Sequence, residues 1–316
     1  MTLRFLSQRV ISLIPLLFLL ILIVFVMVQL APGDPAAIAA GPDASPEAVE
    51  QVRRSLGLDG SFLDRLVSYI SGAVRGDLGT SYVSKESVTD IISRRLPRTL
   101  SLVVLAMIVS VVASIPLGII AALNKGSWLD RGITGLAVFL LAVPPFVFAA
   151  ILVGWFALGG LRIFPPTGYM PMSEGFGEWF KYAALPALAI ATISLAELTR
   201  MMRGSLVDTL EEDYIRTANA KGLNRLRIVG KHAMKNAAIP FITILGLQVG
   251  RIIGAAVIVE AIFNIRGFGQ LGVEAVLQRD MPILQGVVLV SGLIVIITNL
   301  AVDISYGFLN PRTRTQ

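Results

Sequence analysis

The sequence predicts an all-α integral membrane protein with six transmembrane helices. Of its 316 residues, 55% are hydrophobic and only 15% are charged, whereas soluble globular domains carry about 25% charged residues. The apolar residues gather in six runs, each long enough to cross about 30 Å of hydrocarbon as a helix. Unpaired backbone groups are costly in lipid, so each run should be helical despite its prolines. The runs cover residues 10–30, 99–123, 132–158, 183–203, 239–262 and 284–307.

The first run follows Arg4 and Arg9, a charge pattern that signal peptides share. Its apolar stretch, residues 10–30, is longer than the about 7–15 residues of a signal-peptide core. We therefore expect an uncleaved membrane span. The chain contains no cysteine, which excludes disulfides and thiolate metal sites.

Residues 31–97 are expected to form short helices on the extracytoplasmic side. Ser45 is suited to cap a helix that has Pro46 at its first position, and Gly57 to end it. A second helix is indicated by apolar residues at helical spacing, namely Phe62, Leu63, Leu66, Val67 and Ile70. The sequence Gly76-Asp77-Leu78-Gly79 predicts a turn.

Lysine and arginine are distributed unevenly among the loops. They concentrate before the first run, between the second and third, between the fourth and fifth, and after the sixth. The positive-inside rule places these segments, and so both termini, in the cytosol. The net charge of +6 reflects this asymmetry, and we expect no nucleic-acid partner.

A polar, basic segment, residues 200–235, separates two apolar runs. Its pattern predicts two short helices joined at Gly222, which can adopt a left-handed conformation. Asn224 is suited to cap the second helix, in which basic residues recur at four-residue spacing on one face; these are Arg227, Lys231 and Lys235. Such a segment could rest on anionic lipid. Because lipid binding requires neither a glycine break nor an acidic triplet, a protein-docking surface is the preferred interpretation.

Several motifs resemble the permease subunits of bacterial ABC importers, in the dipeptide/oligopeptide (peptide/nickel) family. The runs Glu212–Leu223 and His232–Ala237 resemble the coupling loop of that family. Further similar stretches occur in the family's order along the whole chain: Leu30–Pro35, Gly76–Ser81, Arg95–Leu100, Pro144–Phe146 and Ala196–Arg200. Arg216 stands where permeases in general have glutamate, as it does in the peptide branch, and Asn310 replaces a typical aspartate.

The resemblance implies a type I ABC-importer permease fold in a bacterial cytoplasmic membrane. It implies a first part of residues 1–96, a permease core of 97–307 with a coupling segment of 204–238, and a cytosolic tail of 308–316. The implied partners are a second homologous permease subunit in a heterodimer, two ATPase subunits and an extracytoplasmic peptide-binding protein. The residues implied to couple to the ATPase are Glu212, Asp213, Tyr214, Arg216, Thr217, Ala218, Lys221 and Gly222.

The chain itself is not expected to be an enzyme or to bind a cofactor. It lacks the G-x-x-x-x-G-K-[ST] motif of nucleotide-binding loops, so ATP would be used by the partner subunits. Its single histidine, His232, lies in the cytosolic segment and cannot serve an outward-facing protease site. The resemblance implies dipeptide or oligopeptide import; the alternatives are a nickel-complex, glutathione or other small-solute ABC permease, and a secondary transporter.

Three charged residues within or near the membrane runs are candidates for the translocation pathway. They are Glu197, Arg251 and Glu260. A charge at a helix centre costs about 2.5–3.5 kcal/mol on insertion scales, and such groups usually face a bundle interior or a water-filled cavity. Two structural alternatives stay open: Glu197 could pair with Arg200 three residues later, and Glu260 could lie at the outer interface.

Overall fold

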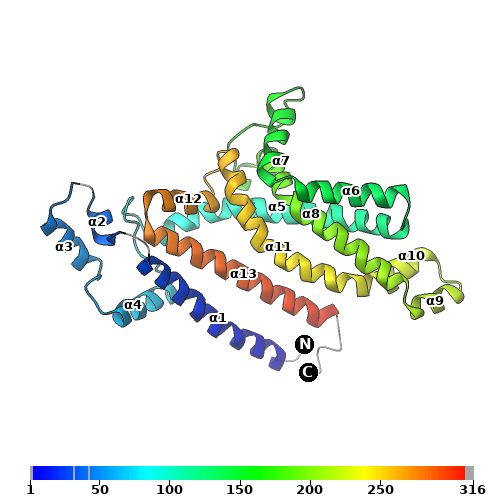
Figure 1. Cartoon of the computed structure of the whole chain (residues 1–316), viewed down its shortest axis with the longest axis horizontal. Coiled ribbons are helices and arrows are strands. Elements are labelled where there is room, and N and C mark those ends of the chain that lie inside the picture. The colour runs from blue at the N-terminus through cyan, green and yellow to red at the C-terminus, as the bar shows by residue number, and fades with distance from the viewer. Residues whose placement is uncertain (1–2, 31–32, 42, 310–316) are drawn as a thin grey trace. The chain divides into compact units, whose positions relative to one another are not determined.

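The computed structural model describes residues 3–30, 33–41 and 43–309. Within these ranges the chain is helical, and it contains an isolated antiparallel bridge between Thr80 and Ser87 but no strand. Loops join the helices (Figure 1). The prediction of an all-α chain is confirmed.

Five helices are long and apolar enough to cross a membrane by themselves. They are α1 (Leu3–Leu30), α5 (Val88–Leu123), α8 (Phe176–Leu210), α11 (Met234–Ile262) and α13 (Met281–Leu309). Pro15, Pro186 and Pro240 lie inside three of these helices, as membrane helices allow.

The third predicted run, residues 132–158, is not a continuous helix. It forms α6 (Trp128–Ala142) and α7 (Pro145–Leu152), which continues as a π-helical turn to Leu158; the two parts meet at an angle of 102°. The break follows from the two adjacent prolines, because a residue before proline is driven out of the helical region. Val143 accordingly has extended backbone angles of −88° and 118°.

The described chain packs as two compact units. One unit is centred on residues 100–265 and takes in α13 from Ile297; the other comprises Ser7–Thr99 and Arg266–Ile296. The division into residues 1–96, 97–307 and 308–316 stays a prediction, and residues 310–316 of the expected tail lie outside the described ranges.

In the first unit, α8 packs against α6, α7 and α11. Gly118 of α5 permits a close approach to α8, because a Cβ atom at this position would lie 2.6 Å from the side chain of Met202. Farther from this contact along the same two helices, the hydroxyl groups of Ser110 and Ser194 hydrogen-bond at 2.9 Å. Small side chains thus let these two helices pack closely in lipid.

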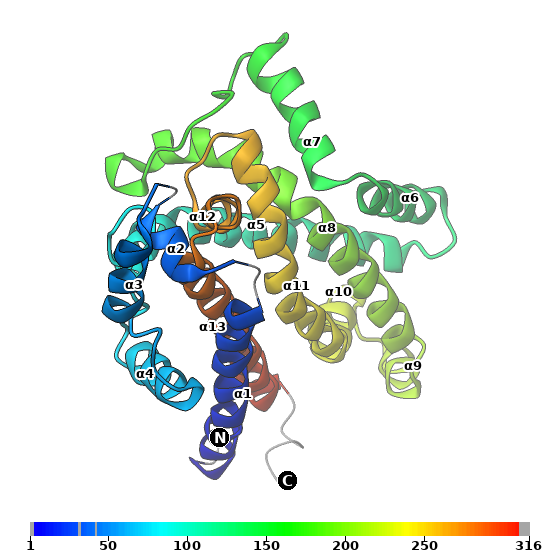
Figure 2. The same cartoon turned by 60° about the vertical axis from the view of Figure 1, so that its left-hand side comes forward.

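The second unit contains the three short helices between α1 and α5, namely α2 (Pro35–Ala40), α3 (Pro46–Ser55) and α4 (Phe62–Val74), together with α12 (Phe268–Gln278). Figure 2 shows them from another side. The predicted cap is confirmed, since the Ser45 hydroxyl accepts a hydrogen bond from the amide of Ala48 at 3.3 Å. Gly57, Gly76 and Gly79 have the positive φ angles expected at helix ends and turns.

Candidate functional site

The predicted coupling segment forms one short helix, α9 (Asp213–Ala220), followed by a left-handed turn. Gly222 has a φ angle of +74°, and the amide of Leu223 donates back to the carbonyl of Ala218 at 3.3 Å. These features close the helix as a Schellman motif does. Asn224 caps the next helix, since its Oδ1 accepts from the amide of Leu226 at 3.0 Å.

The second arm of the segment differs from the prediction of a separate short helix. α10 (Arg225–Arg227) passes through a π-helical segment, residues 228–233, directly into α11. A π-helix has more residues per turn than an α-helix. The placing of Arg227, Lys231 and Lys235 on one face stays a prediction.

A small hydrophobic core attaches α9 to the ends of α8 and α11. The side chain of Ile215 is 1% exposed and belongs to a cluster with Leu206 of α8 and Ile228 and Val229 of the π-helical segment. Ala218 packs on the edge of this core. Because α9 is held from both sides, it can transmit a displacement as part of a packed body.

The remaining residues implied to couple to the ATPase lie on the exposed side of α9 or at its ends. These exposed residues are Glu212, Asp213, Tyr214, Arg216, Thr217, Lys221 and Gly222. Arg216 forms an exposed ion pair with Asp213 at 3.3 Å. The Tyr214 hydroxyl accepts a hydrogen bond from the Asn236 amide at 2.7 Å, which ties α9 to the start of α11.

The loop between α5 and α6 is bonded to the same segment, a feature that sequence reasoning missed. The Lys125 ammonium donates to the Glu211 carboxylate at 2.6 Å, and this bond holds the pKa of Glu211 below its ordinary value. Arg225 donates to the carbonyl of Leu123 at 3.1 Å. Nothing in the spacing of these residues identifies partners so distant along the chain.

Two of the three candidate pathway residues lie in contact. The Glu197 carboxylate of α8 accepts from the Arg251 guanidinium at 2.5 Å and from the Gln248 amide at 2.5 Å, both from α11. The alternative in which Glu197 pairs with Arg200 is wrong. The side chains of Arg251 and Glu197 are 59% and 30% exposed within this chain, so the ion pair remains accessible.

A cavity of about 550 Å³ opens beside this ion pair. Its wall includes Glu197, Arg200, Arg203 and Asp208 of α8 and Ile244 of α11. Arg203 is in turn held by a buried carboxylate of α6, since its Nη2 donates to Asp130 at 2.7 Å. The cavity thus carries both signs of charge, and it can accept a polar solute.

Glu260, the third candidate, does not join this cluster. It is fully buried and lies nine residues after Arg251 on α11, which corresponds to about 14 Å along a helix. A role of Glu260 in the pathway stays a prediction. The alternative of a position at the outer membrane interface also stays a prediction.

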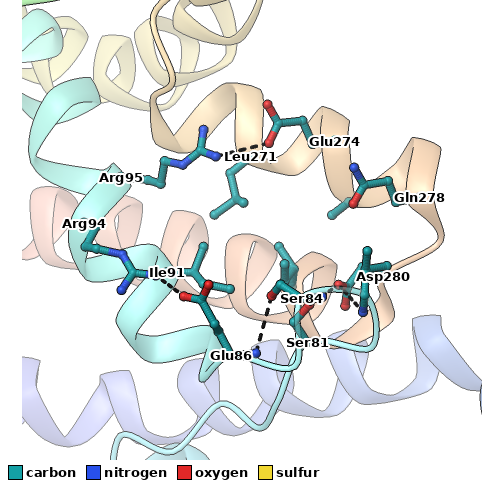
Figure 3. A pocket seen from close by; sticks show the side chains of 13 residues that line it. Ser81, Ser84, Glu86, Ile91, Arg94, Arg95, Leu271, Glu274, Gln278 and Asp280 are labelled. Atoms are coloured by element: carbon teal, nitrogen blue, oxygen red, sulfur yellow. Dashed lines mark hydrogen bonds and ion pairs between the residues drawn. The ribbon is translucent and has the colours of Figure 1, made fainter. Parts of the chain in front are cut away.

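The second unit carries a separate charged pocket of about 300 Å³ (Figure 3). Arg95 points toward Glu274 of α12, with 3.4 Å between their charged atoms, and Arg94 pairs with Glu86. At its other end, the fully buried Asp280 accepts a 2.5 Å hydrogen bond from the Ser81 hydroxyl. Asp280 also accepts from the amides at positions 82 and 83, so it fastens this loop to the start of α13.

Comparison with known proteins is consistent with the fold. Residues 114–315 match the family "Binding-protein-dependent transport system inner membrane component", and residues 2–103 match the N-terminal component of such systems. The chain is 38% identical over 311 residues to a probable peptide ABC transporter permease of Sinorhizobium fredii, with 98% of this chain and 99% of the relative covered.

It is also 39% identical over 312 residues to the glutathione transport system permease protein GsiC of Escherichia coli K12, with 99% of each chain covered. Among solved structures, it resembles the MetNI methionine ABC transporter in an inward-facing conformation, with a TM-score of 0.58 and 14% identity. That match covers 70% of this chain and 96% of the other. The chain therefore belongs to the binding-protein-dependent transport system inner membrane component family, and it is a multi-pass inner membrane permease of the ABC-importer class.

Proposed function

We propose that this permease imports dipeptides or oligopeptides and forms half of a translocation pathway with a second, homologous permease. Two ATPase subunits would supply the energy, and an extracytoplasmic binding protein would deliver the peptide. A peptide cargo is supported by the name of the relative that is 38% identical. The zwitterionic pair of Glu197 and Arg251 supports it further, because a peptide carries one amino and one carboxyl terminus.

Coupling to the ATPase would pass through α9. The observation that carries this proposal is the burial of Ile215 against α8 and α11, while seven of the residues around it are exposed. A partner that pressed on the exposed side would move both long helices, because closely packed elements move together. The left-handed turn at Gly222 would fix the direction in which α10 leaves α9.

Two substitutions test the coupling role in the assembled transporter. Proline at position 222 is incompatible with a φ of +74°, since its ring fixes φ near about −65°, and Arg216→Glu reverses an exposed charge. Both variants should hydrolyse ATP but import less peptide per ATP. Arg131→Glu, an exposed charge reversal on α6, is the matched control. Full stimulated ATPase activity together with full peptide uptake in both Gly222→Pro and Arg216→Glu would refute the coupling role of this segment.

The role of the ion pair is tested with peptides that differ only in their termini. Arg251→Ala should impair uptake of a free-acid dipeptide more than uptake of its amide, because only the former offers a carboxylate. Arg200→Ala, which removes a cation from the wall of the neighbouring cavity, serves as the control. If Arg251→Ala takes up the free-acid dipeptide and its amide as well as wild type does, contact between Arg251 and the transported peptide is refuted.

Glutathione is a second candidate cargo, favoured by the relative that is 39% identical. It carries two carboxylates and one amino group, so it would place greater demand on the cations of the cavity. Uptake of radiolabelled glutathione and of a neutral-side-chain tripeptide by the same reconstituted transporter separates the two cargoes. If the transporter takes up only one of the two compounds, that compound represents its cargo.

A further inference from the structure

Helix α4 exposes an apolar stripe instead of burying it. Leu63, Val67 and Val74 are 67%, 64% and 77% exposed. At about 100° per residue these three positions fall within about 40° of one another around the helix. Leu66 on another side is buried. A helix with an exposed apolar stripe needs an apolar environment outside the protein.

The position of α4 along α1 indicates what that environment is. Phe25 lies within the apolar span Ile11–Leu30 of α1, five residues from its end, or about 7.5 Å along the helix axis. Its ring contacts Phe62 and Tyr69 of α4, with centroid separations of 5.3 and 5.8 Å. In-plane amphipathic helices lie about 5–10 Å deep at the boundary between headgroups and acyl chains, and the distance of Phe25 from the end of the span matches that depth.

The opposite side of α4 borders a cavity of about 310 Å³. Among the described residues, the Nε of Arg65 and the hydroxyl of Tyr69 are buried and have no hydrogen-bond partner. Both residues line the cavity, as do Ser68 and Gln29. Burial raises the pKa of Tyr69 to about 12, so its hydroxyl remains a donor.

Buried donors without partners are rare in folded proteins, so these two groups point to a ligand that accepts hydrogen bonds. The guanidinium of arginine presents a planar fork that matches phosphate oxygens. One acidic side chain, Asp77, also lines the cavity, and its Oδ1 already accepts a hydrogen bond from the amide of Gly79 at 2.9 Å.

We propose that α4 is an in-plane membrane helix and that the cavity beneath it binds the phosphate of a phospholipid headgroup. Arg65 and Tyr69 donate to the phosphate oxygens, while the stripe of Leu63, Val67 and Val74 lies among the acyl chains. The exposed apolar surface of α1 continues this lipid contact, since Ile23, Met27 and Leu30 on its outer third are also exposed.

Lipid retention by the assembled transporter tests the headgroup site. Native mass spectrometry would follow the binding of phosphatidylglycerol to delipidated wild type, Arg65→Gln, Tyr69→Phe and Arg75→Gln. Arg65→Gln should weaken binding about tenfold or more, the factor expected for a lost charge-assisted hydrogen bond, and Tyr69→Phe should also weaken it. Arg75→Gln removes the same charge from the exposed end of α4 and should leave binding unchanged.

Equal losses in Arg65→Gln and Arg75→Gln, or no loss in Arg65→Gln, would overturn the headgroup site. Inorganic phosphate distinguishes a lipid from a free anion: if phosphate alone, in millimolar excess, displaces the lipid, the cavity is a site for a soluble anion and the proposal fails. Retention of the lipid under these conditions supports it.

The depth of α4 can be measured independently, because the chain has no cysteine. A fluorophore attached to Val67→Cys should be quenched by brominated phospholipids, whereas the same probe at Asp64→Cys should be quenched much less. Equal quenching at both positions, or none at Val67→Cys, would contradict an in-plane helix. Strong quenching of Val67→Cys that disappears when a binding protein is added would assign the stripe to that protein instead.

Discussion

Truncating Ile215 to alanine tests the idea that a buried side chain makes α9 part of a packed body. Ile215 is 1% exposed and is the buried residue of an eight-residue helix. A helix of this length is marginal without tertiary packing. Loss of a buried isoleucine side chain to alanine costs about 2–5 kcal/mol, and this cost should fall on the local attachment of α9.

Hydrogen exchange of the α9 amides in the assembled, nanodisc-embedded transporter measures this loss directly. A cost of at least about 2 kcal/mol corresponds to about 30-fold faster exchange or more, since about 1.4 kcal/mol is a factor of ten. Ile215→Val should cost only about 0.5–1.5 kcal/mol and give an intermediate rate. Peptide import per ATP hydrolysed should fall in the same order.

The matched control is Leu226→Ala, which removes an 82% exposed side chain from the same polar segment. Exchange in α9 should not respond to this change. The reasoning is refuted if Ile215→Ala leaves the exchange rate of α9 within about twofold of wild type, because a loss of about 2 kcal/mol would change that rate by much more than about twofold. It is also refuted if Leu226→Ala accelerates exchange as much as Ile215→Ala does.

Three further predictions concern other contacts. The bond to Lys125 lowers the pKa of Glu211 from its ordinary value of 4.5. The pair therefore stabilises the fold at pH values above 4.5, and this contribution is lost as the pH falls through the lower pKa of the folded state. Lys125→Gln should raise the pKa of Glu211, measured by NMR titration of its carboxyl carbon. Gly118→Val should destabilise the protein by about 1–3 kcal/mol through overpacking against Met202, seen as a lower Tm. Asp280→Ala should leave the Ser81 hydroxyl and the amides at positions 82 and 83 unpaired. Each unpaired buried group should cost about 1–3 kcal/mol of stability, and amide exchange at positions 82 and 83 should become faster.

Each of these changes has a control or a contradicting result. Gly132→Ala adds a methyl group where nothing lies within 4 Å, so its Tm should not fall; an equal fall would rule out overpacking as the cause at position 118. Asp59→Ala removes an exposed carboxylate from the same unit as Asp280 and should leave exchange at 82 and 83 unchanged. An unchanged Glu211 titration in Lys125→Gln would show that the bond does not set that pKa.

Local rules were sufficient for the helical elements and their ends. The length of the apolar runs predicted membrane helices because the bilayer thickness and the helix rise are fixed quantities. Ser45 and Asn224 cap helices as predicted, and Gly222 adopts the left-handed conformation, because these preferences depend on a few neighbouring residues. The two prolines at 144 and 145 could also have predicted the break in the third run from the restriction on the residue before proline.

Long-range pairing was beyond the sequence pattern. Glu197 could have satisfied its charge with Arg200 on the same helix, but in the structure it binds Arg251 and Gln248 of α11. The choice depends on how α8 and α11 pack, which no local spacing encodes. The same holds for Ser81 and Asp280, which are separated by 199 residues along the chain.

By itself, the sequence determined that this protein is a bundle of membrane helices with a polar, glycine-broken segment, because hydrophobicity and capping act over short stretches. Only the tertiary structure decided which side of α9 is buried, which charges are paired across helices, and which side of α4 meets the cavity. These features depend on the shapes of packed surfaces, and a side chain acquires its partner only when distant segments of the chain are brought together.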